Sequence, residues 1–193
     1  MIRTFVALDL PTNVQHDLAE FCAPLQKLDV PVSWIPPHRV HLTLKFLGNV
    51  DPTRIEAIEE ALRSVTAQTF PFALRPAGCG AFPSLREMRV VWVGVQGDVS
   101  PLRSLQQRVE GVLEPLGFAR ENRPFRAHLT IGRVKGRRHL KSLQDMLVAR
   151  QGYQGVVFDV SELVLYKSDL KPDGAQYTPL KRLAFQGGLE RLR

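Results

Sequence analysis

Two segments of the sequence are nearly identical, HLTL at residues 41–44 and HLTI at residues 128–131, and about half the chain separates them. The apolar and β-branched residues around each segment predict a β-strand. Side chains two residues apart in a strand point to the same face, so each histidine is expected to share a face with its threonine. The aliphatic residues of both segments, together with Phe46, are expected on the opposite, buried face.

Each segment is a candidate half-site for a phosphate group. His41 and His128 carry imidazoles, which take up and release protons near neutral pH. The hydroxyls of Thr43 and Thr130 can donate hydrogen bonds to phosphate oxygens. Two such half-sites facing each other across a cleft would supply one general acid and one general base. A lone histidine on a strand is usually structural or solvated, but the duplication favours a function.

A metal site is the other alternative for two such histidines. A first-row metal would need a third ligand, commonly a carboxylate or another histidine, and neither segment contains one. The sequence therefore favours a site without a metal. Cys22 and Cys79 are too few for a disulfide framework and form no CxxC pair, so we expect free thiols in a reducing cytoplasm.

Residues around the second segment are candidates for substrate binding. Arg126 has the same strand parity as His128, and Arg133 lies at the end of the predicted strand. Either could pair with phosphate oxygens, although a solvent-exposed role is equally open in a chain so rich in arginine. Phe125 is a candidate platform on which a base could stack.

Other residues of the same types lack a repeated context. His16 falls in a predicted helix and His38 in a predicted loop, and we interpret both as surface residues. Trp34 and Trp92 are interpreted as core residues.

The composition favours a polyanionic partner. Lys and Arg number 26 against 19 Asp and Glu, which gives a net charge of +7. Such an excess attracts polyanions over a long range and through counterion release. The sequence contains no apolar run close to the ~20 residues that a membrane-spanning helix needs. We therefore expect a cytoplasmic protein, without a membrane partner and monomeric.

The predicted elements follow the order strand, helix, strands, helix, strands, and this order occurs roughly twice along the chain. Such an order indicates an α+β fold. No linker divides the halves, so we expect a single domain over residues 1–193 with two lobes. The residues 78–87 read as a Gly/Pro-rich loop that could border a ligand site. Strands are predicted over 4–10, 32–35, 40–47, 70–75, 89–95, 127–133, 156–160, 163–167 and 177–185. Helices are predicted over 11–28, from Pro52 through Leu62, from Ser100 through Leu113, and over 143–150.

The duplicated His-x-Thr-x motif resembles the 2H phosphoesterase superfamily. Within it, the chain is similar to the bacterial and archaeal RNA 2′,3′-cyclic phosphodiesterases, historically called LigT-like 2′-5′ RNA ligases. The family often has proline before the second histidine, where this chain has Ala127. Five collinear segments carry the resemblance: MIRTFVALDLP (1–11), WIPPHRVHLTLKFLGNV (34–50), FPSLREMRVVWVGV (82–95), RPFRAHLTIGRV (123–134) and LYKSDLKPDGAQYTPLKRLAF (165–185).

The resemblance implies a bilobal fold, with two pseudo-symmetric lobes whose antiparallel sheets surround a central groove. It implies hydrolysis of 2′,3′-cyclic phosphates, on RNA ends or nucleotides, to 2′-phosphomonoesters, without a cofactor. In that reaction His41 would be the proton donor to O3′ and His128 the proton acceptor from water, while Thr43 and Thr130 hold phosphate oxygens. The alternatives are 2′-5′ RNA ligation and a non-catalytic, basic RNA-binding module.

Overall fold

The computed structural model describes residues 1–171 and 174–187, and its strands form one antiparallel sheet. The strands are β1 (Ile2–Leu8), β2 (Val32–Trp34), β3 (Leu42–Val50), β4 (Phe72–Pro83), β5 (Met88–Gly97), β6 (His128–Val134), β7 (Phe158–Val160), β8 (Glu162–Lys171) and β9 (Gly174–Ala184). The helices are α1 (Thr12–Gln26), α2 (Ile55–Thr66), α3 (Val99–Leu113) and α4 (Leu140–Ala149), with short 3-10 helices η1 (Pro37–Arg39) and η2 (Pro52–Arg54).

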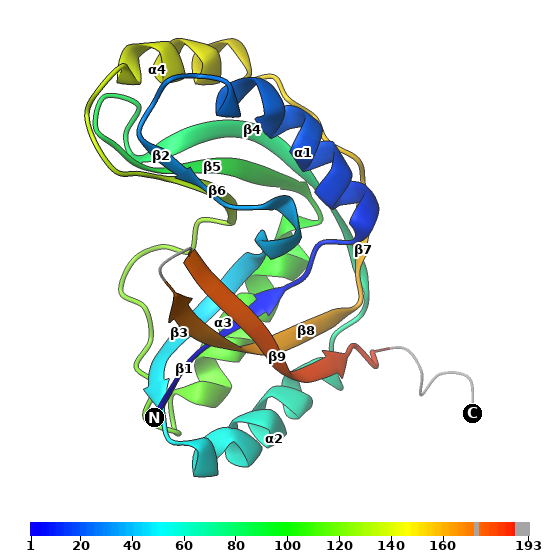
Figure 1. Ribbon diagram of the computed structural model, residues 1–193. Coiled ribbons are helices and arrows are strands. Elements are labelled where there is room, and N and C mark those ends of the chain that lie inside the picture. The colour runs from blue at the N-terminus through cyan, green and yellow to red at the C-terminus, as the bar shows by residue number, and fades with distance from the viewer. Residues whose placement is uncertain (172–173, 188–193) are drawn as a thin grey trace.

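The sheet is divided between two halves of the molecule. Its order is β7-β4-β5-β6-β3-β1-β8-β9, with β2 paired to the side of β6. Helices α1 and α4 lie with β2, β4, β5 and β6 in one half, and α2 and α3 lie with β1, β3, β8 and β9 in the other (Figure 1). The halves join where β3 runs beside β6. This arrangement confirms the predicted two-lobed α+β fold with antiparallel strands.

The two faces of the sheet have different surroundings. Along β1, Val6 and Leu8 belong to the main apolar core, which includes residues of all four α-helices. Phe5 and Ala7, which point the other way, form a small second cluster with Val164 and Tyr166. The second cluster therefore lies on the face that the helices leave open, and it continues toward the histidines.

Strand β3 departs from simple alternation, which overturns the expectation that Phe46 is buried. Val6 pairs with Lys45 and Ala7 with Thr43, so Leu44 is an extra residue in β3. A second register shift follows between Thr4 and Phe5. An extra residue in one strand reverses which face the following side chains take. Phe46 is consequently 63% exposed, whereas Lys45 is turned inward and is only 6% exposed.

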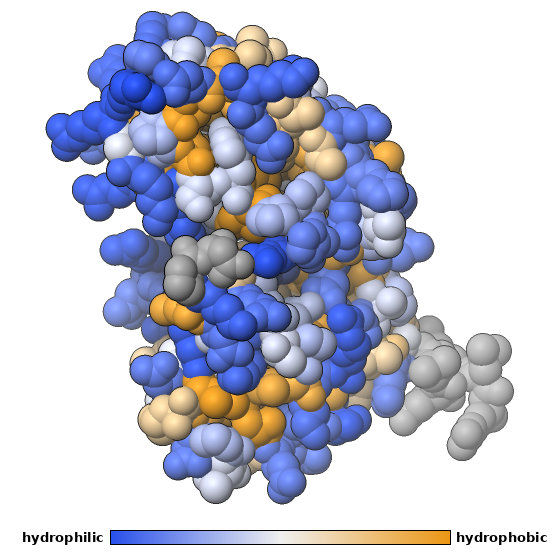
Figure 2. All heavy atoms as spheres, in the orientation of Figure 1, coloured by the Kyte–Doolittle hydropathy of each residue, from blue (hydrophilic) through white to orange (hydrophobic). Residues whose placement is uncertain are grey.

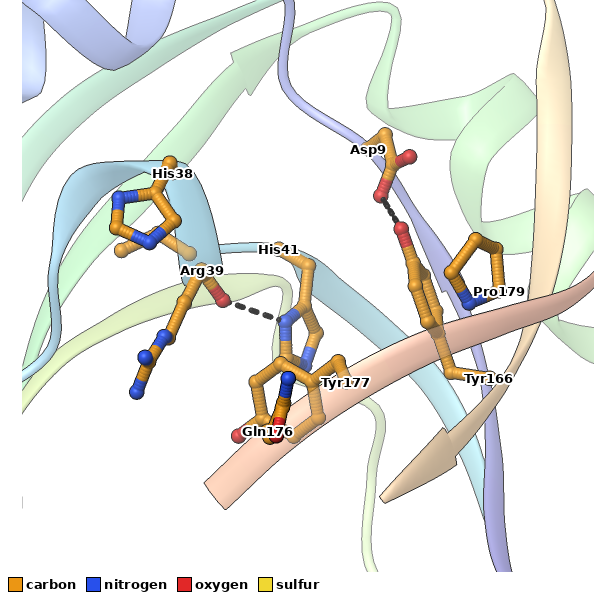
Figure 3. A pocket seen from close by; sticks show the side chains of 9 residues that line it. Asp9, His38, Arg39, His41, Tyr166, Gln176, Tyr177 and Pro179 are labelled. Atoms are coloured by element: carbon orange, nitrogen blue, oxygen red, sulfur yellow. Dashed lines mark hydrogen bonds between the residues drawn. The ribbon is translucent and has the colours of Figure 1, made fainter. Parts of the chain in front are cut away.

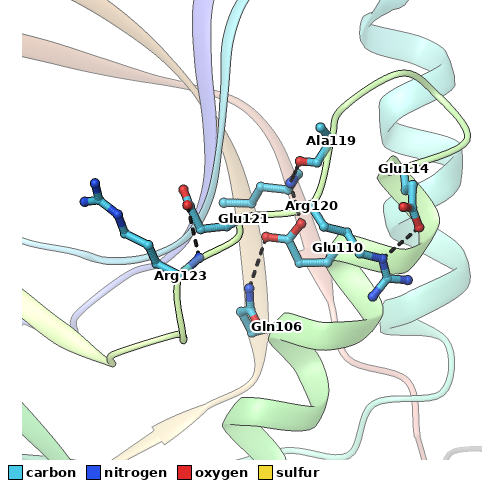
Figure 4. Close-up of polar contacts among 8 residues, drawn as sticks. Gln106, Glu110, Glu114, Ala119, Arg120, Glu121 and Arg123 are labelled. Carbon is cyan, nitrogen blue, oxygen red and sulfur yellow. Dashed lines mark hydrogen bonds and ion pairs between the residues drawn. The ribbon is translucent and has the colours of Figure 1, made fainter.

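The buried Lys45 forms an ion pair with Glu110 of α3, and both side chains are almost fully buried. The ammonium also donates to the carbonyl oxygen of Ala119 at 2.7 Å. Gln106 in turn donates to the other oxygen of Glu110 at 3.2 Å, as Figure 4 shows. This cluster links β3 to α3 and to the loop that leads toward β6.

Two further sequence expectations need correction. The segment 78–87 was expected to be a loop, but β4 extends through Pro83, because its residues continue to pair with β5. Trp34 is half-buried and packs against the main core, in line with its interpretation as a core residue. Trp92 is half-buried on the open face, where its ring lies 5.4 Å from that of Phe82. The turn of the closing hairpin, residues 172–173, lies outside the described residues.

The remaining sequence expectations concern membranes and thiols. None of the described helices is long and apolar enough to cross a membrane. Cys22 and Cys79 are free, as expected, and both are buried. Burial raises the pKa of the Cys22 thiol to about 12 and that of Cys79 to about 11, so both remain protonated near neutral pH.

Candidate active site

The two repeated segments meet at the junction of the halves. Leu42 of β3 is paired directly with Leu129 of β6, and both are buried in the core, at 1% and 0% exposure. Continuing this antiparallel register by one residue in each direction brings His41 opposite Thr130 and Thr43 opposite His128. All four side chains therefore face away from the core.

This register also sets the spacing of the histidines. His41 and His128 are diagonal neighbours across the strand pair, a relation in which residues lie about 7–8 Å apart and their Cβ atoms somewhat closer. A phosphate group can lie between two imidazoles at that separation and receive a hydrogen bond from each. The structure thus brings together the four residues that the repeated motif singled out.

Both histidines are oriented by the same backbone contact. Nδ1 of His41 lies 2.9 Å from the carbonyl oxygen of Arg39, and Nδ1 of His128 lies 2.7 Å from that of Arg126. Because a carbonyl oxygen can only accept, Nδ1 must carry the hydrogen in each ring. The bond fixes the tautomer, and Nε2 is left as the nitrogen that can exchange a proton.

Arg39 is a site residue that the sequence analysis missed. The repeat is longer than four residues, because Arg39 precedes His41 by two positions just as Arg126 precedes His128. A comparison of the two segments extended toward the N-terminus could have found it. The arginine side chains differ in setting, since Arg39 is half-buried and Arg126 is exposed.

His41 lies among aromatic rings of the second cluster. Its ring stacks on Phe5 at 4.7 Å between centroids and meets Tyr177 edge-on at 4.9 Å. Burial is the main influence on its pKa and lowers it from the ordinary value of 6.5. The hydrogen bond to Arg39 and the charge of Asp9 raise the pKa in part, and the charge of Arg133 lowers it further.

His128 has a different neighbour. The ring of Phe82 meets it edge-on at 5.0 Å, and Phe82 also contacts the ring of Trp92. Phe82 belongs to the segment that was expected to be a loop. That segment does border the site, as the sequence analysis anticipated, although it does so as a strand.

The three weaker candidates lie in distinct places. The register between β5 and β6 skips Ile131, which turns Arg133 to the face of His128, and Arg133 is exposed there. Its positive charge is the smallest of the influences on the pKa of His41, which it lowers. Arg126 is exposed beside His128. Phe125 is half-buried and packs against the main core, which leaves less of its ring for stacking a base.

A cavity of about 280 Å³ lies beside His41 (Figure 3). Tyr166 in its wall donates a hydrogen bond to Asp9, and Asp9 also forms an ion pair with Arg182 at 2.9 Å. His38 is exposed, as expected, but it also lines this cavity. Residues that line it include Asp9, His38, Arg39, Tyr166, Gln176 and Tyr177.

The sequence analysis missed most of these cavity residues. Asp9 comes from the end of β1, whereas Gln176 and Tyr177 come from β9, near the other end of the chain. No repeat or local spacing connects them with His41. The pairing of β1 with β3 and β8, and of β8 with β9, brings these segments together.

Figure 2 shows mainly hydrophilic side chains on the face in view, with smaller apolar patches between them. Among residues 1–171 and 174–187, no group of three or more His, Cys, Asp or Glu side chains is placed to hold a metal ion.

We expect NMR to show a pKa for His41 below 6.5 in the free protein, because burial disfavours the imidazolium. A bound phosphate anion should raise this pKa, so binding takes up a proton. The affinity for a nucleoside 2′-monophosphate should therefore increase as the pH falls from the bound-state pKa to the free-state pKa. The His41 signal is assigned by its absence from the His41→Ala spectrum. A pKa above 6.5 in the free protein would contradict this expectation.

Comparisons with known proteins give a consistent result. The model of the 2′-5′ RNA ligase superfamily matches residues 10–172. The chain is 33% identical to an RNA 2′,3′-cyclic phosphodiesterase of Methanothermobacter thermautotrophicus, over 93% of this chain and 97% of that one. It is also 33% identical to an RNA 2′,3′-cyclic phosphodiesterase of Thermotoga maritima, over 98% and 99%.

Solved structures agree with the sequence relatives. The structure of a Thermus thermophilus protein superposes with a TM-score of 0.80 at 26% identity, and covers 97% of this chain and 100% of its own. E. coli LigT in complex with 3′-AMP superposes with a TM-score of 0.73 at 26% identity, over 95% and 98%. These matches extend over both halves of the molecule.

Proposed function

The chain belongs to the 2′-5′ RNA ligase superfamily, and on this premise we propose that it is an RNA 2′,3′-cyclic phosphodiesterase in which His41 and His128 exchange the protons. The observation that carries the proposal is the common orientation of the two histidines. Each donates Nδ1–H to a backbone carbonyl and keeps Nε2 for a substrate. With Thr43 and Thr130 between them, the pair forms two matching half-sites around one position for phosphorus.

The proposed reaction is an in-line displacement at phosphorus. Nε2 of His128 accepts a proton from water while the water oxygen bonds to phosphorus. The bond between phosphorus and O3′ breaks, and O3′ takes a proton from Nε2 of His41. The product is a 2′-phosphomonoester, and both imidazoles then exchange protons with solvent. Thr43 and Thr130 donate to the non-bridging oxygens, where negative charge increases in the transition state.

The electrostatic setting of His41 fits a general acid whose imidazole becomes protonated when the anionic substrate binds. The free protein disfavours the imidazolium through burial, whereas the acid role needs it. The anionic cyclic phosphate resolves this conflict, because an opposite charge within reach raises the pKa. Arg133 and Arg126, which are exposed beside the motifs, can bind phosphate oxygens of the same substrate.

The decisive experiment is to incubate the protein with an oligonucleotide that ends in a 2′,3′-cyclic phosphate, in the presence of a chelator, and to identify the product isomer. We expect a 2′-phosphate, formed at a rate that the chelator leaves unchanged, because the imidazoles rather than a metal activate water. Loss of activity in chelator that one divalent ion restores would contradict the proposed mechanism. A 3′-phosphate product would show that His41 does not protonate O3′.

The same reaction mixture separates the rival functions. Ligation is the competing reaction in which a 5′-hydroxyl attacks the cyclic phosphate in place of water, and the family description includes it. Adding an RNA with a 5′-hydroxyl end would give a joined 2′-5′ product if ligation competes with hydrolysis. Binding without any turnover would indicate an RNA-binding module instead.

We further propose that residues 1–193 act as one unit, since strands of both halves belong to one sheet. The chain is expected to act as a monomer in a reducing compartment such as the cytoplasm, where its two thiols stay free.

A further inference from the structure

A cavity lies beside the half-site of His41. The cavity of about 280 Å³ borders His41, and His128 is not among the residues that line it. Ligand sites for small molecules usually begin at about 300 Å³, so this cavity suits one nucleoside rather than a longer segment of RNA. The cavity is therefore a candidate position for the part of the substrate that lies next to His41.

The proposed reaction assigns a side to the ribose. In a 2′,3′-cyclic phosphate the leaving oxygen O3′ is part of the ribose, and in-line geometry puts the attacking water on the opposite side of phosphorus. The ribose must therefore lie on the side of the general acid, and its base lies beyond it on the same side. The cavity beside His41 is on that side.

The wall of this cavity offers groups that suit a nucleobase. Tyr177 is held edge-on against Phe5 at 5.2 Å and against His41 at 4.9 Å, so its ring is preorganised. Gln176 is exposed at the cavity, and none of the described residues bonds its side-chain amide. A glutamine amide has both donor and acceptor atoms, as the polar edge of a base requires.

On the basis of the proposed function, we propose that the cavity beside His41 is the subsite for the terminal nucleoside of the substrate. Tyr177 contacts the ring of the base, and the amide of Gln176 hydrogen-bonds its polar edge. Tyr177 thereby touches both the base and the general acid, so base binding and the position of His41 are connected.

The test compares nucleoside 2′,3′-cyclic phosphates with the base-free compound 1-O-methylribose 2′,3′-cyclic phosphate. We expect kcat/KM of the wild-type protein to be at least about tenfold higher with a base, since stacking on an aromatic ring contributes strongly to binding. In Gln176→Ala the ratio of kcat/KM with a base to kcat/KM without a base should fall about three- to tenfold. The change should appear in KM rather than kcat, because the lost hydrogen bond is made before the chemical step. Tyr177→Ala should lower this ratio further.

The control is Thr178→Ala, an exposed neighbour in β9 that does not line the cavity. It should keep the wild-type advantage. Equal kcat/KM with and without a base in the wild-type protein, or equal behaviour of Gln176→Ala and Thr178→Ala, would overturn the subsite.

Binding of adenosine and uridine 2′-monophosphates, compared with 1-O-methylribose 2-phosphate, tests the subsite without turnover. The nucleotides should bind more tightly than the base-free compound. Compared with Thr178→Ala, the Gln176→Ala variant should bind the nucleotides more weakly and the base-free compound equally well. If no cyclic phosphate is hydrolysed but this preference holds, the proposed function fails and the subsite stands. If hydrolysis proceeds and the preference is absent, the subsite alone fails.

Discussion

His41→Ala and His128→Ala are each expected to slow hydrolysis of a 2′,3′-cyclic phosphate by at least about 10²-fold, the usual contribution of a general acid or base. Each substitution removes an Nε2 that the fold orients through a backbone carbonyl, and the register places no second imidazole opposite the vacated position. The loss should be measured in kcat under saturating substrate. Affinity for a 2′-phosphate product should decrease less, because Thr43 and Thr130 still bind the phosphate.

A double variant sharpens this prediction. Both histidines act in one transition state, so the combined loss should be much smaller than the product of the two single losses. His16→Ala is the matched control, because His16 is exposed on α1, belongs to neither motif and does not line the cavity beside His41. Near-normal turnover in either His41→Ala or His128→Ala would show that the histidine has another task.

Lys45→Ala is expected to destabilise the protein by about 3–5 kcal/mol, the cost of leaving the partner of a buried ion pair without compensation. The side chains of Lys45 and Glu110 are only 4% and 7% exposed, so water cannot replace the lost contact. The carbonyl of Ala119 also loses its hydrogen bond. Urea unfolding measures the change as a lower midpoint.

Two variants make the origin of this loss clear. Lys141→Ala removes an ion pair with Asp145 whose side chains are 76% and 59% exposed, so its effect should be below about 1 kcal/mol. Lys45→Met/Glu110→Leu removes both buried charges and should recover part of the stability, as apolar replacements of buried pairs often do. If Lys45→Ala unfolds at the same urea concentration as Lys141→Ala, the pair is not a stabilising element.

The sequence by itself determined the arrangement of the two motifs within their strands. Strand alternation depends only on local backbone geometry, so it correctly placed His41 beside Thr43 and His128 beside Thr130, with Leu42 and Leu129 buried. The four helices were also predicted, with bounds that differ from those of α1 to α4 by a few residues. The alternation was wrong for Phe46, because the extra residues in β3 are set by its pairing with β1, and a local pattern contains no information about a partner strand.

The setting of the histidines was decided only by the tertiary structure. From the sequence, the surplus of positive charge disfavours imidazolium and a bound phosphate favours it, and neither tendency says which histidine is affected. The sheet places Phe5 and Tyr177, from opposite ends of the chain, against His41, and the resulting burial lowers its pKa. The same packing forms the cavity on that side. Two nearly identical segments thus acquire different surroundings, because burial depends on contacts between residues distant in sequence.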